Sequence, residues 1–241
     1  MGALDGRTAL VTGASSGIGR AIALALAGAG ARLALNGRDT ARLAQVAEEA
    51  RAHGTEASAY AADLTVPADV HSLKFSTDAD FGAVDILVHS AGLFTGGNVP
   101  ELPVDAFRAQ LEVNAVAPYV LTQTFLPALR RRRGDIVFIN SRAGQRVVSH
   151  AAAYSASKFA LRALADGLRA AVGPDGVRVL SVYPGAIATP MQEQVQHWLG
   201  NAYDPARYPQ PDEVAACVLA SLALPRGSEV TDLTVKPQHD G

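Results

Sequence analysis

Short apolar segments alternate with longer amphipathic segments along almost the whole chain. The longer segments are rich in Ala, Leu, Glu and Arg and predict helices, among them Thr40–His53, Pro103–Arg130 and Ala152–Val172. Because strands that alternate with helices build βαβ units, we expect a doubly wound α/β fold, with helices on both faces of a parallel sheet. Seven segments have the length and apolar content of its strands: Arg7–Thr12, Arg32–Asn36, Glu56–Ala61, Asp85–His89, Asp135–Asn140, Arg178–Tyr183 and Glu229–Val235.

The chain shows no linker, repeat or low-complexity tract, and its 241 residues suffice for one core. We therefore expect a single domain over residues 1–241. Residues 184–211 break the alternation, because they carry five prolines and the only tryptophan, Trp198. Connections of this length in compact domains are often functional, so we expect a substrate-side lid here. The alternative is a packed excursion at the periphery.

Composition and charge exclude several classes of protein. Hydrophobic residues make up 49% and charged residues 18%, and the net charge of −2 does not favour nucleic acid or anionic lipid. No apolar run reaches the length of a membrane span. A single cysteine, Cys217, lies in an apolar run, which predicts a core position, no internal disulfide and a cytoplasmic protein. The basic run Arg130–Arg133 is typical of a solvated helix end, and the six histidines lack metal-ligand spacing, so we expect no metal.

A glycine-rich turn follows the first predicted strand and precedes a helix. Gly13 permits the tight turn, Gly17 lets the backbone approach a pyrophosphate, and Gly19 lets the helix pack closely on the strand. The helix N-terminus then offers free N–H groups to phosphate. The alternative is a plain strand–helix junction, but the order of strand, turn and helix favours a dinucleotide cofactor. Its predicted contacts here are Gly13, Ser15, Ser16, Gly17, Ile18 and Gly19.

The spacing Thr-Gly-x-x-x-Gly-x-Gly of this turn resembles that of the short-chain dehydrogenase/reductase family, which has a Rossmann fold. Similar family motifs follow in order along nearly the whole chain: Asp63-Leu64, His89-Ser90-Ala91-Gly92, Asn114, Ser141, Tyr154-x-x-x-Lys158 and Tyr183-Pro184-Gly185 with Thr189. His89 and Ser90 depart from the pattern, since the family usually has Asn at both positions. The resemblance implies further cofactor contacts at Asp63, Leu64, Ser90, Ala91, Gly92, Tyr154, Lys158, Pro184, Gly185, Ile187 and Thr189.

The end of the second predicted strand bears on the choice between NADP(H) and NAD(H). By the resemblance, Gly37 stands where NAD-preferring members carry Asp, and Arg38 follows it. A guanidinium binds a 2′-phosphate well, so we expect NADP(H), with NAD(H) less favoured. Arg20 is expected to add positive charge nearby. The alternative is that Arg38 is solvated while Asp39 caps the next helix and pairs with Arg42.

Tyr154 and Lys158 are four residues apart, so on a helix they share one face. Tyrosine ordinarily has a pKa near 10, and an ammonium together with an oxidised nicotinamide would lower it toward about 7. We expect Tyr154 to exchange a proton with a carbonyl or alcohol while hydride moves to or from the cofactor. The resemblance implies that Ser141 positions the substrate oxygen, Lys158 holds the ribose, and Asn114 holds a relay water.

Two other functions are alternatives to a hydride-transferring oxidoreductase. A non-catalytic nucleotide-binding or scaffolding relative is favoured only by the altered His89-Ser90 turn, and a Ser-His-Asp hydrolase has no Gly-x-Ser-x-Gly motif to support it. The partner is expected to be a small carbonyl or alcohol substrate, and the resemblance implies a homodimer or homotetramer. The expected substrate walls are Leu93, Phe94, Gln145, Val147, His150, Tyr183 and the Met191–Leu199 segment.

Overall fold

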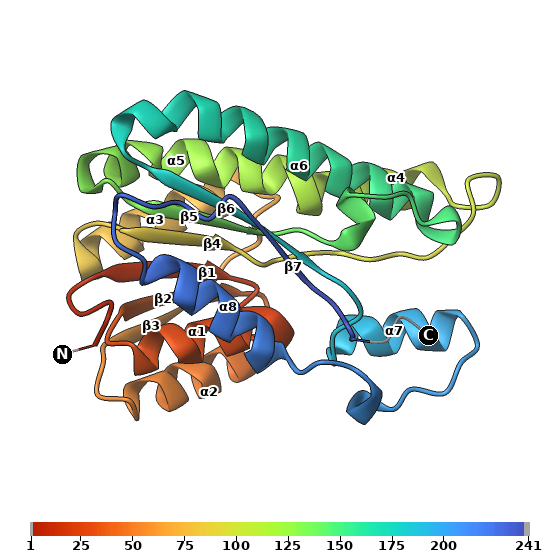
Figure 1. Ribbon diagram of the computed structural model, residues 1–241, viewed down its shortest axis with the longest axis horizontal. Helices are drawn as coiled ribbons and strands as arrows, with labels where there is room; N and C mark the ends of the chain where they lie inside the picture. Colours follow the sequence, from red (N-terminus) through yellow and green to blue (C-terminus); the bar gives the residue numbers. More distant parts are fainter. Residues whose placement is uncertain (1, 239–241) are drawn as a thin grey trace.

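The computed structural model describes residues 2–238, and its centre is a seven-stranded sheet in which every neighbouring pair of strands is parallel. The strand order is β3-β2-β1-β4-β5-β6-β7 (Figure 1). This confirms the predicted doubly wound α/β fold. The strands are β1 (Thr8–Thr12), β2 (Arg32–Gly37), β3 (Ala57–Ala61), β4 (Ile86–His89), β5 (Asp135–Ile139), β6 (Arg178–Pro184) and β7 (Asp232–Val235).

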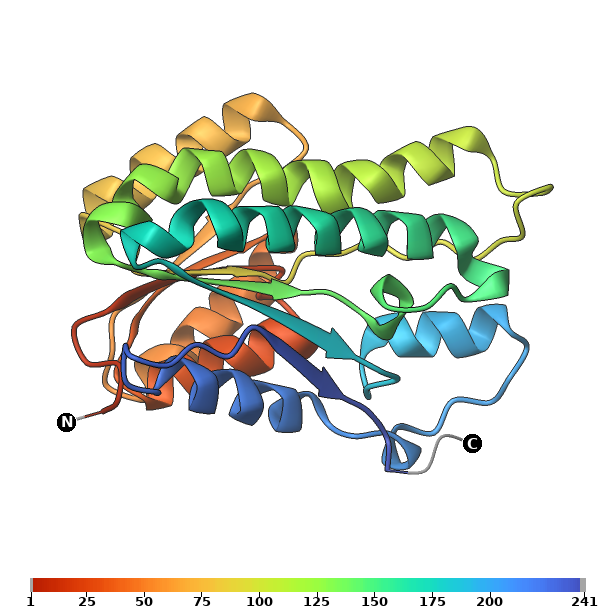
Figure 2. The same cartoon turned by 45° about the horizontal axis from the view of Figure 1, so that its top comes forward.

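Helices cover both faces of the sheet, as Figures 1 and 2 show. One layer holds α1 (Gly17–Gly28), α2 (Thr40–Arg51) and α8 (Pro211–Leu222). The other holds α3 (Pro67–Phe81), α4 (Val104–Leu111), α5 (Ala117–Arg132) and α6 (Ala152–Val172). Each layer has its own core: Ala9 and Val11 of β1 face one, and Leu10 between them faces the other. Central strands are buried on both sides, which explains why they read as continuous apolar runs. None of the described helices is both long and apolar enough to cross a membrane.

Two predicted elements differ from the structure by more than two residues. The stretch predicted as one helix over Pro103–Arg130 consists of α4, a π-helical segment (Glu112–Val116) and α5. The wider π turn carries Asn114, whose side chain is occupied by the backbone of the loop after β4. The last strand begins at Asp232 rather than Glu229, because the Glu229 carboxylate, not its backbone, accepts from the Val179 N–H at 2.8 Å.

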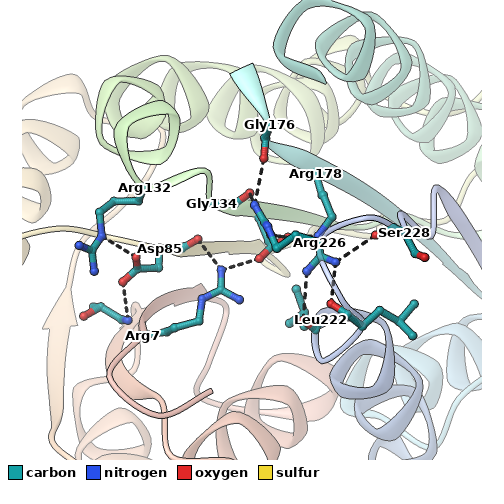
Figure 3. Close-up of polar contacts among 12 residues, drawn as sticks. Arg7, Asp85, Arg132, Gly134, Gly176, Arg178, Leu222, Arg226 and Ser228 are labelled. Atoms are coloured by element: carbon teal, nitrogen blue, oxygen red, sulfur yellow. Dashed lines mark hydrogen bonds and ion pairs between the residues drawn. The ribbon is translucent and has the colours of Figure 1, made fainter. Parts of the chain in front are cut away.

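A charged network closes the amino-terminal edge of the sheet (Figure 3). The carboxylate of Asp135, only 2% exposed, pairs with Arg7, with Arg178 Nε at 2.6 Å and with Arg226 Nη1 at 2.8 Å. Arg178 also donates to the carbonyl oxygens of Leu222, Leu224 and Ser228, so the network ties the segment after α8 to the sheet.

The basic run at the end of α5 contributes to the same edge. Arg132 Nε binds the carboxylate of Asp85 at 2.7 Å, and Arg130 Nε binds that of Asp175 at 2.7 Å. Arg133 adopts a left-handed conformation, with a φ of 48°, at the C-cap. All four arginines are exposed at the end of α5, which confirms the predicted solvated helix end, and Arg130 and Arg132 also form ion pairs there. Cys217 is half-buried rather than part of the core.

The segment expected to form a lid contains a helix, α7 (Pro190–Trp198), and a short 3-10 turn (Pro205–Arg207). Thr189 caps α7 by accepting the Gln192 N–H at 3.1 Å, and Pro190 fits the first turn because it needs no donor there. Figures 1 and 2 place α7 beyond the carboxyl ends of the strands, separate from both helical layers.

Candidate active site

A cavity of about 1060 Å³ opens at the carboxyl edge of the sheet, where β1 has β2 on one side and β4 on the other. This is the point at which the strand order reverses, and doubly wound folds bind ligands there. All residues predicted to contact the cofactor line the cavity: Gly13, Ser15, Ser16, Gly17, Ile18, Gly19, Arg38, Asp63, Leu64, Ser90, Ala91, Gly92, Tyr154, Lys158, Pro184, Gly185, Ile187 and Thr189.

The turn between β1 and α1 is packed too tightly for side chains. A Cβ on Gly19 would lie 2.3 Å from the Gly13 carbonyl oxygen, and one on Gly13 would lie 2.8 Å from the backbone of Ala91. Gly17 has a φ of 53°, which favours glycine. Ser16 precedes α1 without capping it through its side chain, so the first N–H groups of the helix are available to an anion. These features fit a pyrophosphate.

Thr12, the last residue of β1, fixes the turn after β4 through hydrogen bonds. The Thr12 hydroxyl accepts the N–H groups of Ser90 and Ala91 at 3.0 and 3.2 Å and donates to Val88 O at 3.2 Å. His89, which departs from the family pattern, is buried, stacks on Phe138 and bonds Thr122 Oγ1 through Nε2 at 2.9 Å. Burial lowers the pKa of His89 to about 3, so it is a neutral part of the core at physiological pH.

Arg38 is exposed at the nucleotide end of the cavity. Asp39 caps α2 by accepting the Arg42 N–H at 3.0 Å, and it pairs with the Arg42 side chain. Both contacts of Asp39 agree with the alternative prediction, in which Arg38 has no nucleotide role. Hydrogen bonds from Thr65 are the main reason that the pKa of Asp63 is lowered, with a smaller contribution from Arg38. The expectation that Arg20 adds charge here was wrong, because Arg20 pairs with Glu49 and does not line the cavity.

Tyr154 and Lys158 lie one turn apart on α6, both buried, with Lys158 Nζ 5.8 Å from the centre of the Tyr154 ring. Lys158 Nζ donates to Ile139 O at 3.0 Å, and burial lowers its pKa to about 8. Burial raises the pKa of Tyr154 to about 12, opposed by a hydrogen bond with Ser141. This direction is opposite to the one predicted from two neighbouring cations, because in the protein alone desolvation of the phenol dominates.

Asn114 is fully buried and does not line the cavity. Its Oδ1 accepts the Leu93 N–H at 2.8 Å, and its Nδ2 donates to Leu93 O at 2.8 Å and to Ser157 Oγ at 2.9 Å. The Ser157 hydroxyl donates to Tyr154 O at 2.7 Å. Asn114 therefore joins the loop after β4 to the helix that carries Tyr154 and Lys158.

Asn140, at the end of β5, was not identified from the sequence. Its Oδ1 accepts the Ser141 N–H at 2.8 Å, and its Nδ2 donates to Lys158 O at 3.2 Å. The Ser141 hydroxyl in turn accepts the Ala143 N–H at 3.1 Å. One buried amide thus orients the segment that bears Ser141 relative to the helix that bears Lys158. In the sequence, its position directly before Ser141 was the one feature that could have indicated a role for Asn140.

Only some of the predicted substrate walls line the cavity. Phe94 and His150 line the cavity, with Met191 and Val195 of α7. Four expected wall residues do not line it: Leu93, Gln145, Val147 and Tyr183. The Gln145 side chain turns away to bond Thr234 Oγ1 at 3.3 Å, Val147 is 66% exposed, and Tyr183 is buried in β6.

Aromatic side chains form the roof above Tyr154. The Phe94 ring lies edge-on to the Tyr154 ring, with centroids 5.3 Å apart. Trp198 lies at the end of α7, and the centre of its ring is 6.4 Å from that of Phe94 and 5.6 Å from that of His150. A Cβ on Gly96 would come within 2.3 Å of the indole of Trp198, so the loop after β4 needs glycine where α7 docks.

Among the described residues, which exclude His239, no group of three or more His, Cys, Asp or Glu side chains is placed to hold a metal ion.

Known proteins resemble this chain along almost its entire length. The model of the short chain dehydrogenase family matches residues 7–200. An uncharacterised oxidoreductase of Staphylococcus saprophyticus is 34% identical over 97% of this chain and 98% of its own. The crystal structure of an alcohol dehydrogenase from the archaeon Thermococcus sibiricus, complexed with 5-hydroxy-NADP, has a TM-score of 0.89 at 31% identity, covering 96% of this chain and 97% of its own. An NAD+-bound xylitol dehydrogenase has a TM-score of 0.88 at 28% identity, covering 97% of this chain and 99% of its own.

Proposed function

The chain belongs to the short-chain dehydrogenase/reductase family of oxidoreductases, and from this premise we propose that it transfers a hydride between NADP(H) and a carbonyl or alcohol substrate. The observation that carries the proposal is the placement of Tyr154 and Lys158, side by side on α6, in the same cavity as the glycine-rich turn. When bound, the nicotinamide cofactor supplies the hydride in reduction and accepts it in oxidation.

The residues present fit such a cofactor. The tight turn at Gly13 and Gly19 leaves no room for side chains, and the uncapped start of α1 offers N–H donors to the pyrophosphate. Asp63 and Leu64 would contact the adenine, and Lys158 would hold the ribose near the nicotinamide. The Ser90-Ala91-Gly92 turn and the segment from Pro184 to Thr189 would complete the site.

Tyr154 would donate its phenolic proton to the carbonyl oxygen in reduction and take the hydroxyl proton in oxidation. The raised pKa of Tyr154 keeps the donor protonated at neutral pH, which suits reduction. Ser141 would hold the substrate oxygen through its hydroxyl, and the Lys158 ammonium would stabilise negative charge near that oxygen. Asn114 would fix the loop after β4 and, through a water, connect Lys158 to solvent.

The remaining expectations belong to the same proposal. Residues 1–241 would act as one domain, with residues 184–211 as the lid over a small-molecule substrate. We expect a cytoplasmic homodimer or homotetramer that binds neither nucleic acid nor membrane.

The proposed hydride transfer is tested by incubating the protein with NADPH and a panel of ketones and aldehydes. It fails if NADPH binds but no carbonyl compound consumes it.

The preference for NADP(H) rests on Arg38, which lines the nucleotide end of the cavity without an ion pair among the described residues. Replacing Arg38 with alanine is expected to weaken NADPH binding by about tenfold and to leave NADH binding unchanged, because a charge-assisted hydrogen bond to the 2′-phosphate is lost. Gly37→Asp should reverse the preference, since a Cβ there meets Leu43 and Ser15 only at 3.4 Å and the carboxylate repels the phosphate.

The measurement is the dissociation constant of each cofactor by calorimetry. Arg42→Ala is the matched control, because Arg42 lies four residues away, is exposed and does not line the cavity. An unchanged ratio of the two constants in Arg38→Ala would remove the argument for NADP(H).

A further inference from the structure

The charges that line the cavity are distributed unevenly. Among the described lining residues, two carry carboxylates, Asp39 and Asp63, and both lie at the nucleotide end beside Arg38. None of the described lining residues near the catalytic pair carries a carboxylate. Arginines contribute instead: Arg142 and Arg146 from the segment after β5, and Arg207 from the turn after α7.

Arg146 is an exposed residue that lines the cavity close in sequence to the catalytic candidates. It lies on the short segment that leaves Ser141 and returns to Tyr154, and this segment is anchored by the Val148 N–H, which donates to Ser155 Oγ at 3.1 Å. The neighbouring Gln145 side chain bonds Thr234 on β7, whereas Arg146 lines the cavity. Within residues 2–238 no carboxylate pairs with the Arg146 guanidinium.

The body of the same compartment is apolar. Phe94, Val148 and Val195 line it, with His150 beside them, and Trp198 packs behind Phe94. An apolar wall beside Tyr154, together with cationic lining residues, is complementary to an apolar carbonyl compound that bears a negative charge.

We propose that the substrate is a carbonyl compound with an anionic group, a carboxylate or a phosphate, on an apolar body, and that Arg146 binds the anionic group. This inference rests on the proposed function, because it assigns the substrate class of the same site. Arg146 acts as a specificity-determining residue, and the positive charge of Arg207, which also lines the cavity, raises the local concentration of anions.

The experiment compares three aromatic ketones of similar size: 4-acetylbenzoate, 4-acetylphenyl phosphate and the neutral 4-acetylbenzamide. Their binding to the NADP+ complex is measured by calorimetry, and their KM and kcat are measured with NADPH. At low ionic strength we expect at least one anion to bind about tenfold more tightly than the amide, with a lower KM. The anion that gains affinity identifies the group as carboxylate or phosphate.

Arg146→Gln should reduce the preference for the anion to about twofold and raise KM while kcat stays similar, since the reacting groups are untouched. Arg131→Gln, an exposed arginine at the end of α5, is the matched control and should retain the preference. The preference of the wild type should also shrink as salt is added. The positive charge of the oxidised nicotinamide is the same in both proteins. The difference between wild type and Arg146→Gln therefore measures the effect of Arg146 alone.

The failures of the two proposals are distinguishable. If no ketone consumes NADPH, the proposed hydride transfer fails, while the binding measurements still decide the role of Arg146. If ketones are reduced but the amide binds as tightly as both anions, the substrate class is wrong. If the anion is preferred equally by wild type and Arg146→Gln, the assignment to Arg146 is overturned.

Discussion

Tyr154→Phe is expected to lower kcat for carbonyl reduction by about 10²–10⁴-fold, while NADPH binds as tightly as to the wild type. The substitution removes only the hydroxyl that would donate the proton, and the ring can keep its edge-on contact with Phe94. The measurement is NADPH consumption at saturating substrate, with cofactor affinity determined separately. Tyr119→Phe is the matched control, because Tyr119 is half-exposed on α5 and its hydroxyl contacts only Gln123 among the described residues.

The dependence on pH provides a second readout of the same group. Burial raises the pKa of Tyr154 to about 12, so its acid form is present throughout the neutral range and is lost only as pH rises toward that value. Alcohol oxidation needs the phenolate, so its rate should increase with pH, and Tyr154→Phe should remove that dependence. If Tyr154→Phe has the same kcat as the wild type across the pH range, Tyr154 is not the proton donor.

Asp135→Asn is expected to destabilise the fold by about 3 kcal/mol, the lower part of the range for breaking a buried ion pair. The substitution leaves Arg7 and the largely buried Arg178 without their carboxylate, and Arg226 loses the same partner at a more exposed position (Figure 3). For a chain of this length the midpoint of thermal unfolding should fall by roughly 6–12 °C.

Urea unfolding measures the change in free energy. Asp105→Asn is the matched control, since the side chain of Asp105 is 88% exposed and pairs with Arg108, whose side chain is 73% exposed. Its effect should stay below about 1 kcal/mol. Equal stabilities of Asp135→Asn and wild type would show that the network does not hold the amino-terminal edge. Because this edge is opposite the cavity, cofactor affinity of the folded variant should not change.

The fold was predictable because burial on both faces leaves a strong pattern. Strands such as Asp135–Ile139 are continuous apolar runs, and helices separate them at regular intervals. The π-helical segment at Glu112–Val116 was not predictable, since its cause is a long-range contact between Asn114 and the backbone of Leu93. The late start of β7 likewise depends on the side chain of Glu229 reaching Val179.

The residues that line the nucleotide end of the cavity were predictable because their motifs are local. The turn from Gly13 to Gly19 is one continuous segment, and all its predicted contacts line the cavity. The substrate part was less predictable, because rotamers and distant partners decide which side chains face inward. Gln145 bonds Thr234, 89 residues away, whereas the adjacent Arg146 faces the cavity. The pKa of Tyr154 depends on burial, which spacing alone does not reveal.

The central claim is that hydride passes between the cofactor and a carbonyl carbon in this cavity. The most direct test is to incubate the wild-type protein with NADPH deuterated at the transferable position of the nicotinamide and a reactive ketone, and to analyse the alcohol by mass spectrometry and NMR. The account predicts one deuterium on the carbinol carbon, in a single stereochemical configuration, and almost no labelled alcohol with Tyr154→Phe. Tight binding of NADPH with no deuterium in any product would contradict it.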